Sequence, residues 1–283
     1  MNASSTQNNC RLFLSEENIE WPDNTVYLLL DAVRFDNIKR WIYEAEPNPE
    51  MRTLFLNTEL HDIAVVSPEL VKVEKYSPLW TRFMEEGLAL QAGVILLSDF
   101  SFEALIIHCQ WWCRVLNQCN EVAICRLYDP NLCGWLFKAS SPQQLSYLLG
   151  PVSDLYCLSD GEWLAVKNPQ PNTDNNYEEP LTLGQNQWNA VFEAKYHFFL
   201  KRLVQHMDNY FPTYLTGLDL PQKLKHADSL CNEAASLNFE TEQDIFFYCN
   251  VLGFLGHDIL QPDIYPEIYT LLTQSSSLTP SQR

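Results

Sequence analysis

The residues most able to take part in chemistry are charged side chains within an apolar stretch. We expect residues 122–129 to form a strand, in which Arg126 and Tyr128 point to one face and Asp129 to the other. A buried arginine needs a carboxylate partner, because an unpaired buried charge costs several kcal/mol. Asp31, at the end of an earlier apolar run, is the expected partner. This set could form an active site at the sheet edge, but no nucleophile or metal-ligand set accompanies it, so we interpret it as a structural ion pair.

The cysteines could instead suggest a metal site. The chain has nine, and five of them fall between residues 109 and 133. Their spacing contains no paired C-x2-C knuckles of the kind found in zinc sites. We interpret them as buried free thiols that act as small hydrophobic side chains. The five are Cys109, Cys113, Cys119, Cys125 and Cys133.

Neither the histidines nor the common hydrolase and nucleotide-binding motifs indicate a catalytic or metal site more strongly. His-Asp dipeptides occur at positions 61–62 and 257–258. Helical His-Asp metal phosphohydrolases need such a pair with an upstream His and a downstream Asp on one helical bundle. The first pair is expected in a loop among strands and the second just past a helix C-cap, so we interpret them as surface or capping residues. His197 and His206 are nine residues apart, so they do not form the i, i+4 pair of zinc proteases. We find no G-x-S-x-G elbow, phosphate-binding loop or G-x-G-x-x-G sequence. The prediction is a protein that is not an enzyme and has no catalytic residues, metal or cofactor.

Composition narrows the class of partner. The formal net charge is −18, and both halves of the chain are acidic. Nucleic acids and anionic membrane surfaces are therefore not expected partners. The opening residues resemble no signal peptide, and no apolar run reaches the ~18 residues of a membrane span. We expect a cytoplasmic protein without stable membrane insertion, whose thiols stay reduced.

Apolar runs alternate with helical periodicity as far as residue 167. Continuous apolar strands are typical of sheets buried on both faces, so we predict an α/β domain over 25–167 with a mixed or mostly parallel sheet and flanking helices. The expected strands are 25–33, 53–57, 70–74, 93–98 and 122–129, with a hairpin around 159–163. The expected helices are 35–45, 77–90, 102–117, one from 130 to about 137, and 142–149.

The rest of the chain has a different composition. Residues 168–186 are rich in Pro, Asn and acidic residues, which indicates a linker between domains. Only helices are expected beyond it, in an all-α domain over 187–275. These helices are 188–210, 221–236, 242–255 and 264–273, with Thr241 and Asp244 in a capping box and Gly256 as a C-cap. Residues 1–24 and 276–283 are expected to be a polar N-terminal segment and a tail.

Four segments in order resemble a known family. YLLLDAVR (27–34), SPELVKV (67–73), GVILLSDFSFEALIIHCQWWCRVL (93–116) and CRLYDP (125–130) are similar to the N-terminal domain of the type VI secretion effector adaptors. The resemblance covers about residues 25–137. At Cys125 other members often have a larger aliphatic residue, which concerns packing only. The matching positions are Asp31, Pro68, Leu70, Val71, His108, Arg126, Tyr128, Asp129 and Pro130.

The resemblance implies a function through protein partners. Such adaptors act as chaperones: they bind a cognate effector in the producing cell and deliver it to the VgrG spike, and they are not themselves secreted. Two alternatives remain open. One is a hydrolase-like enzyme with a site near Asp31, Arg126 and Asp129, and the other is an immunity protein that binds a toxin.

The helical part is rich in aromatic residues, which dominate the energetics of protein interfaces. Most of them are expected to form its core. We predict that Phe199, Phe247 and Tyr248 line an apolar groove for the effector. Alanine at these three positions is then expected to abolish effector co-purification without changing the circular dichroism spectrum.

Overall fold

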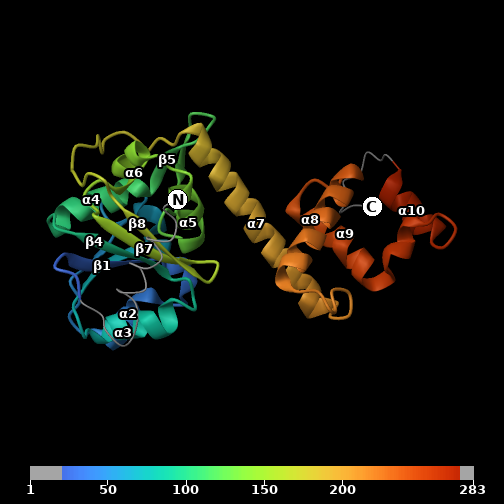
Figure 1. Cartoon of the computed structure of the whole chain (residues 1–283), viewed down its shortest axis with the longest axis horizontal. Coiled ribbons are helices and arrows are strands. Elements are labelled where there is room, and N and C mark those ends of the chain that lie inside the picture. The colour runs from blue at the N-terminus through green and yellow to red at the C-terminus, as the bar shows by residue number, and fades with distance from the viewer. Residues whose placement is uncertain (1–20, 275–283) are drawn as a thin grey trace, which may run out of the picture. The chain divides into compact units, whose positions relative to one another are not determined.

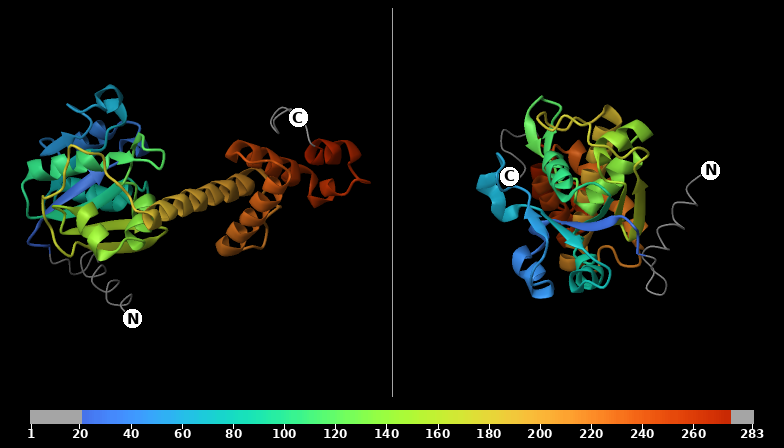
Figure 2. Two further views of the ribbon diagram at one scale, coloured as in Figure 1. Left: turned by 90° about the horizontal axis from the view of Figure 1, so that it is seen from above. Right: turned by 90° about the vertical axis from the view of Figure 1, so that its left-hand side faces the viewer.

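The computed structural model describes residues 21–274, except for the side chain of His257, and it divides into two compact units (Figures 1 and 2). The first unit is residues 1–194 and the second is residues 195–283. Most of the expected N-terminal segment 1–24 and the whole expected tail 276–283 lie outside the described residues. The two units are described separately below.

The first unit is built on a six-stranded sheet with the strand order β2-β3-β1-β4-β7-β8. Every registered pair of neighbours is antiparallel. The layered α/β architecture is confirmed, but the expectation of a mixed or mostly parallel sheet is wrong. The strands are β1 (Thr25–Leu30), β2 (Met51–Thr53), β3 (Glu69–Val73), β4 (Gly93–Ser98), β7 (Asp154–Ser159) and β8 (Glu162–Lys167).

Helices cover both faces of this sheet (Figure 1). Tyr27 and Leu29 of β1 pack into one core with α4 (Phe102–Trp112), α5 (Pro130–Lys138) and α6 (Pro142–Leu149). The alternate β1 residues Val26, Leu28 and Leu30 pack into a second core with α2 (Ile38–Ala45) and α3 (Pro78–Arg82). A continuous run of apolar residues thus indicates that a strand is buried on both faces. It does not indicate whether neighbouring strands are parallel, because the connections between the strands determine their directions.

Several predicted elements end early. The strand expected at 53–57 is limited to β2 and continues as turns, and the helix expected at 102–117 ends at Trp112. The strand expected at 122–129 is only β6 (Val122–Ile124), which pairs with β5 (Arg114–Leu116) in a separate two-stranded sheet. The Asn117 side chain accepts hydrogen bonds from the backbone N–H groups of Cys119 and Glu121, both at 2.9 Å, and so stabilises the β5–β6 turn.

The described part of the first unit also contains three short helical segments. They are η1 (Ala32–Arg34), η2 (His61–Val66) and the π-helical turn η3 (Phe83–Gly87). The first two are single-turn or irregular 3-10 segments that follow β1 and β2 in the chain. The sequence predicted only the third, as part of the helix at 77–90.

Residues 168–186, the predicted linker, belong to the first unit and pack into it. Leu181 is fully buried in the core, and its backbone exchanges hydrogen bonds of 2.8 and 2.9 Å with Leu116 and Arg114. The compact units divide after Ala194 instead, within α7 (Gln185–Tyr210). A Pro- and Asn-rich composition excludes regular helices and strands, but it does not exclude packing through single apolar side chains.

The second unit contains only helices in its described part (orange to red in Figures 1 and 2), which confirms the predicted all-α region. These are the end of α7, α8 (Leu220–Ser236), α9 (Glu242–Leu255), η4 (His257–Leu260) and α10 (Pro266–Thr273). Thr241 and Asp244 form the predicted capping box of α9, and Gly256 ends that helix with a φ of 75°. None of the helices within residues 21–274 is both long and apolar enough for a membrane span.

Candidate functional site

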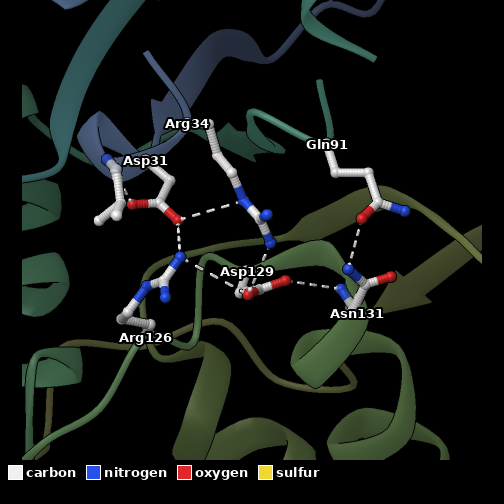
Figure 3. Close-up of polar contacts among 7 residues, drawn as sticks. Asp31, Arg34, Gln91, Arg126, Asp129 and Asn131 are labelled. Atoms are coloured by element: carbon white, nitrogen blue, oxygen red, sulfur yellow. Dashed lines mark hydrogen bonds and ion pairs between the residues drawn. The ribbon is translucent and has the colours of Figure 1, made fainter. Parts of the chain in front are cut away.

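Four charged side chains meet beside the C-terminal end of β1 (Figure 3). Arg126 Nη2 donates a hydrogen bond to Asp31 Oδ2, so the predicted ion pair is present. The same nitrogen lies 3.6 Å from Asp129 Oδ2. Arg34 Nη2 donates to that Asp129 oxygen at 3.2 Å, and Arg34 Nε lies 3.9 Å from Asp31 Oδ2. We call Asp31, Arg34, Arg126 and Asp129 the charged cluster.

The chain turns where a continuing strand was predicted. Residues 126–129 form a turn, with the Asp129 N–H donating to the Arg126 carbonyl at 2.9 Å. Asp129 Oδ1 accepts from the Asn131 N–H at 3.1 Å and so caps α5, with Pro130 at the first helical position. Arg126 and Asp129 therefore reach the same cluster, and their predicted placement on opposite faces is wrong.

The charged cluster balances its own charges, with two carboxylates and two guanidinium groups. The Asp31 side chain is fully buried, that of Asp129 is 17% exposed and those of the arginines are about one-third exposed. Burial lowers the pKa of Arg126, but the hydrogen bond to Asp31 and the charges of Asp31 and Asp129 outweigh that effect and raise its pKa overall. Arg126 therefore stays positively charged throughout the physiological range.

Neighbouring groups extend the cluster without adding a reactive one. The Asp31 N–H donates to the Ala92 carbonyl at 2.6 Å, and Asn131 Nδ2 donates to Gln91 Oε1 at 2.6 Å. The Tyr128 side chain is buried, and burial raises its pKa well above the usual value, so the phenol stays protonated. The arrangement joins β1, η1 and the start of α5, and its carboxylates already accept hydrogen bonds from arginines.

The other residues of the resemblance are not brought to this cluster. Leu70 and Val71 are fully buried on opposite faces of β3, and the Pro68 carbonyl accepts from the Leu54 N–H at 3.1 Å. His108 lies inside the core, where its Nε2 is 2.9 Å from the Leu148 carbonyl oxygen. Burial lowers the pKa of His108 to about 3, so its imidazole is neutral. These positions stabilise the interior of the unit.

The possible metal ligands are similarly dispersed. Within the described residues, no group of three or more His, Cys, Asp or Glu side chains could hold a metal ion. Cys109, Cys113, Cys125 and Cys133 are buried, whereas Cys119 is exposed. Burial raises the pKa of Cys113 far above its usual value, so this thiol remains protonated.

The histidines considered in the sequence analysis lie apart from one another in the chain and in different surroundings. His61 lies on η2 and is exposed. His206 Nε2 lies 2.6 Å from Asn250 Oδ1, which joins α7 to α9. The side chain of His257 is outside the described part of the chain.

A groove with a volume of about 510 Å³ lies in the second unit, between α9 and α10. Helix α9 is apolar on almost all sides: Ile245, Cys249 and Leu252 face the core, and Phe247 and Phe254 face the groove. We call this feature the apolar groove. Its main lining residues are Phe247, Tyr248, Val251 and Phe254 of α9 and Ile268, Leu271 and Leu272 of α10.

The three predicted groove residues have different positions. Phe247 lines the groove with 41% of its surface exposed, and Tyr248 lines it as a fully buried floor. Phe199 lies outside it, buried in the core with its ring 5.8 Å from that of Phe246. The sequence prediction missed Phe254 and Leu271, which are 81% and 50% exposed. The spacing of residues 247, 251 and 254 is the signal that could have revealed this second apolar face of α9.

Comparisons with known proteins relate the first unit to a family. Residues 26–147 match the family described as "Domain of unknown function (DUF4123)". These residues are therefore similar to the DUF4123 family over less than half of the chain. The whole charged cluster lies within the matched residues 26–147, and the apolar groove lies C-terminal to them in the sequence.

A second comparison covers most of the chain. The chain is 25% identical to "Accessory protein VasW" of Vibrio cholerae over 258 residues. The aligned residues cover 91% of this chain and 84% of that protein. No solved structure matches the chain. Together with the match to the DUF4123 family, this similarity confirms the family resemblance that the four sequence segments indicate.

Proposed function

We propose that this protein is a cytoplasmic adaptor and chaperone of type VI secretion, which binds a cognate effector and helps to load it onto the VgrG spike. An association with type VI secretion is supported by the match to the DUF4123 family and by the similarity to VasW. Effector binding and VgrG loading go further, and they rest on the segments that resemble the adaptor family and on the apolar groove.

The apolar groove is the observation that carries the proposal. Phe254 is 81% exposed although it is a large apolar side chain, and Phe247 and Leu271 extend the same surface. Large exposed apolar patches are uncommon on proteins that act alone, and they mark sites of interaction. Aromatic side chains are also the residues that contribute most per residue to protein interfaces.

The charged cluster favours an adaptor over a hydrolase. A catalytic carboxylate must reach substrate or water, but Asp31 is fully buried and accepts a hydrogen bond from Arg126. Asp129 accepts from Arg34 and also caps α5. We therefore propose that Asp31, Arg126 and Asp129, with Pro68, Tyr128 and Pro130, form a structural signature of the segment that matches the DUF4123 family and not an active site.

Co-expression of the full chain with a candidate toxin effector and a VgrG protein tests the proposal. We expect a ternary complex that survives size-exclusion chromatography. The double variant Phe247→Ala/Phe254→Ala is expected to weaken effector capture about tenfold or more. The matched control is Tyr43→Ala, which removes an aromatic side chain that is 50% exposed on α2 of the first unit.

Two results would contradict an adaptor. A wild-type chain that captures neither the effector nor VgrG has no loading function. A chain that binds the toxin and protects cells from it, without affecting its export, is an immunity protein.

A further inference from the structure

In the part of the sequence that forms the apolar groove, all formally charged residues are acidic. Between Lys225 and Arg283 there are eight Asp and Glu residues and no Lys or Arg. The groove residues, from Phe239 to Leu272, all fall within this interval. A partner that enters the groove therefore meets an apolar floor within an acidic segment.

Two of these acidic residues adjoin the groove in the sequence and are exposed. Glu240 follows the lining residue Phe239. Glu267 precedes Ile268 and lies one helical turn before Leu271 on α10. Other acidic residues are already engaged, since Glu242 pairs with Arg202 at 2.6 Å and Asp244 caps α9.

The walls of the groove select the secondary structure of its occupant. Residues of α9 and α10 form both walls, and helix backbones make their hydrogen bonds within the helix. A strand edge that could pair with an extended peptide is therefore not offered here. A groove between two helices is instead suited to the apolar face of a third helix.

We infer that the apolar groove binds a cationic amphipathic helix of the effector. Apolar side chains at helical spacing enter between Phe247, Phe254 and Leu271, and Lys or Arg side chains on the flanks pair with Glu240 and Glu267. This inference rests on the proposed function, because it assigns the helix to the effector.

Charge also argues against a second copy of this chain, or one of its terminal segments, as the occupant of the groove. A second copy has a net charge of −18 and the same acidic groove segment, so two copies would place like charges together. Residues 1–20 contain one arginine against three glutamates. Residues 275–283 contain Leu278 as their single large apolar residue, so neither terminal segment has the sequence expected of a cationic amphipathic helix.

The test uses the full-length protein and two labelled synthetic peptides, with binding followed by fluorescence anisotropy. One peptide is an amphipathic helix with Leu and Phe on one face and Lys on the other, and the second has Glu in place of every Lys. We expect the Lys peptide to bind and the Glu peptide to bind at least about tenfold more weakly, from several paired rim charges.

Three single substitutions localise the binding. Phe254→Ala is expected to weaken binding of the Lys peptide about tenfold or more. Glu240→Lys and Glu267→Lys should each weaken it about two- to fivefold, as expected for exposed charge pairs. Glu193→Lys makes the same change of net charge on an exposed residue of α7 in the first unit, and it should leave binding unchanged.

Several results would overturn the inference. Equal binding of the two peptides, or equal effects of Glu193→Lys and Glu267→Lys, would show that the rim charges do not select the ligand. Tighter peptide binding after deletion of residues 1–20 or 275–283 would identify a terminal segment as the occupant. A dimer that Phe254→Ala dissociates, seen by sedimentation, would identify a second copy.

The same variants separate this inference from the proposed function. If the wild-type chain captures no effector and no VgrG, the proposed function fails whatever the peptides show. If it captures the effector and Phe254→Ala prevents this, but Glu240→Lys and Glu267→Lys have no effect, the adaptor stands and the cationic helix is rejected.

Discussion

The charged cluster and the apolar groove place opposite kinds of side chain in opposite environments. In the first unit, Asp31 is a charged residue that is fully buried, where Arg126 and Arg34 compensate its charge. In the second unit, Phe254 is an aromatic residue that is 81% exposed. Burial of a charge stabilises a fold only when partners compensate it, whereas exposure of an aromatic ring contributes nothing to a fold.

This difference separates a structural role from a binding role. The cluster joins two segments that are distant in the sequence, 31–34 and 126–129, and each of its carboxylates is engaged by an arginine. Within the second unit, the groove leaves apolar surface exposed, to which a binding partner could provide contacts. We therefore expect substitutions in the cluster to affect stability and substitutions on the groove walls to affect binding.

The largest predicted effect separates the buried aromatic residues of the second unit from the exposed one. Phe199→Ala and Tyr248→Ala should each lower the free energy of unfolding by about 3–5 kcal/mol, because both side chains are buried. Phe254→Ala should lower it by less than about 1 kcal/mol. Urea unfolding followed by circular dichroism measures all three.

This prediction also corrects the sequence-based test of the groove. Alanine at residues 199 and 248 is expected to disturb the fold itself, so loss of effector binding there would not report on the groove. If Phe254→Ala lowered the free energy of unfolding as much as Tyr248→Ala, the distinction between the buried Tyr248 and the exposed Phe254 would be contradicted.

The next effect concerns the charged cluster. Arg126→Ala should lower the free energy of unfolding by about 2–4 kcal/mol, because it leaves the buried Asp31 with only the more distant Arg34. Arg40→Ala is the matched control, since it removes an exposed pair with Glu44 and should change the free energy of unfolding very little. If Arg126→Ala proves as mild as Arg40→Ala and still abolishes turnover of a small substrate, the cluster is an active site.

A smaller effect, which depends on pH, concerns a buried carboxyl group of the first unit. The Glu69 carboxyl lies inside the first unit, where burial raises its pKa to about 7, opposed by hydrogen bonds from Thr53 and the charge of Lys39. A pKa raised on folding means that the stabilising contribution is complete below about 4.5 and is lost as the pH rises through about 7. The loss is about 3 kcal/mol at most.

Comparison with Glu69→Gln isolates this contribution. The amide stays neutral, so the free energy of unfolding of this variant should rise relative to wild type between about pH 5 and 8, by about 1–3 kcal/mol. The buried His108, whose pKa is lowered to about 3, acts oppositely as the pH falls below 6.5, but it is common to both proteins. Glu50→Gln, at an exposed carboxylate, is the matched control, and the same trend in both variants would contradict the assignment.

The sequence predicted the parts of the charged cluster that depend on local context. Asp31 and Arg126 stand among apolar residues, which implies burial and hence pairing. It did not predict Arg34, because a surface-like position three residues after Asp31 shows no sign of the 3-10 turn that brings it back. It also placed Asp129 on the wrong face, because capping of α5 ends the strand sooner than β propensity suggests.

In the second unit, local signals predicted the helices almost completely. The capping box at Thr241 and the stop at Gly256 place the ends of α9 correctly, because caps depend on neighbouring residues alone. The same sequence could not show which aromatic residues face outward. Phe199 and Phe247 are alike in type and helical setting, yet only Phe247 lines the groove.

The sequence alone determined the residue periodicity, the caps, the acidic charge and the family segments, since each is a property of neighbouring residues or of composition. The tertiary structure decided the antiparallel strand order, the packing of residues 168–186 into the first unit and the exposure of Phe254. These features depend on which distant segments pack together. That packing is the sum of many contacts of small individual energy, which no short stretch of sequence contains.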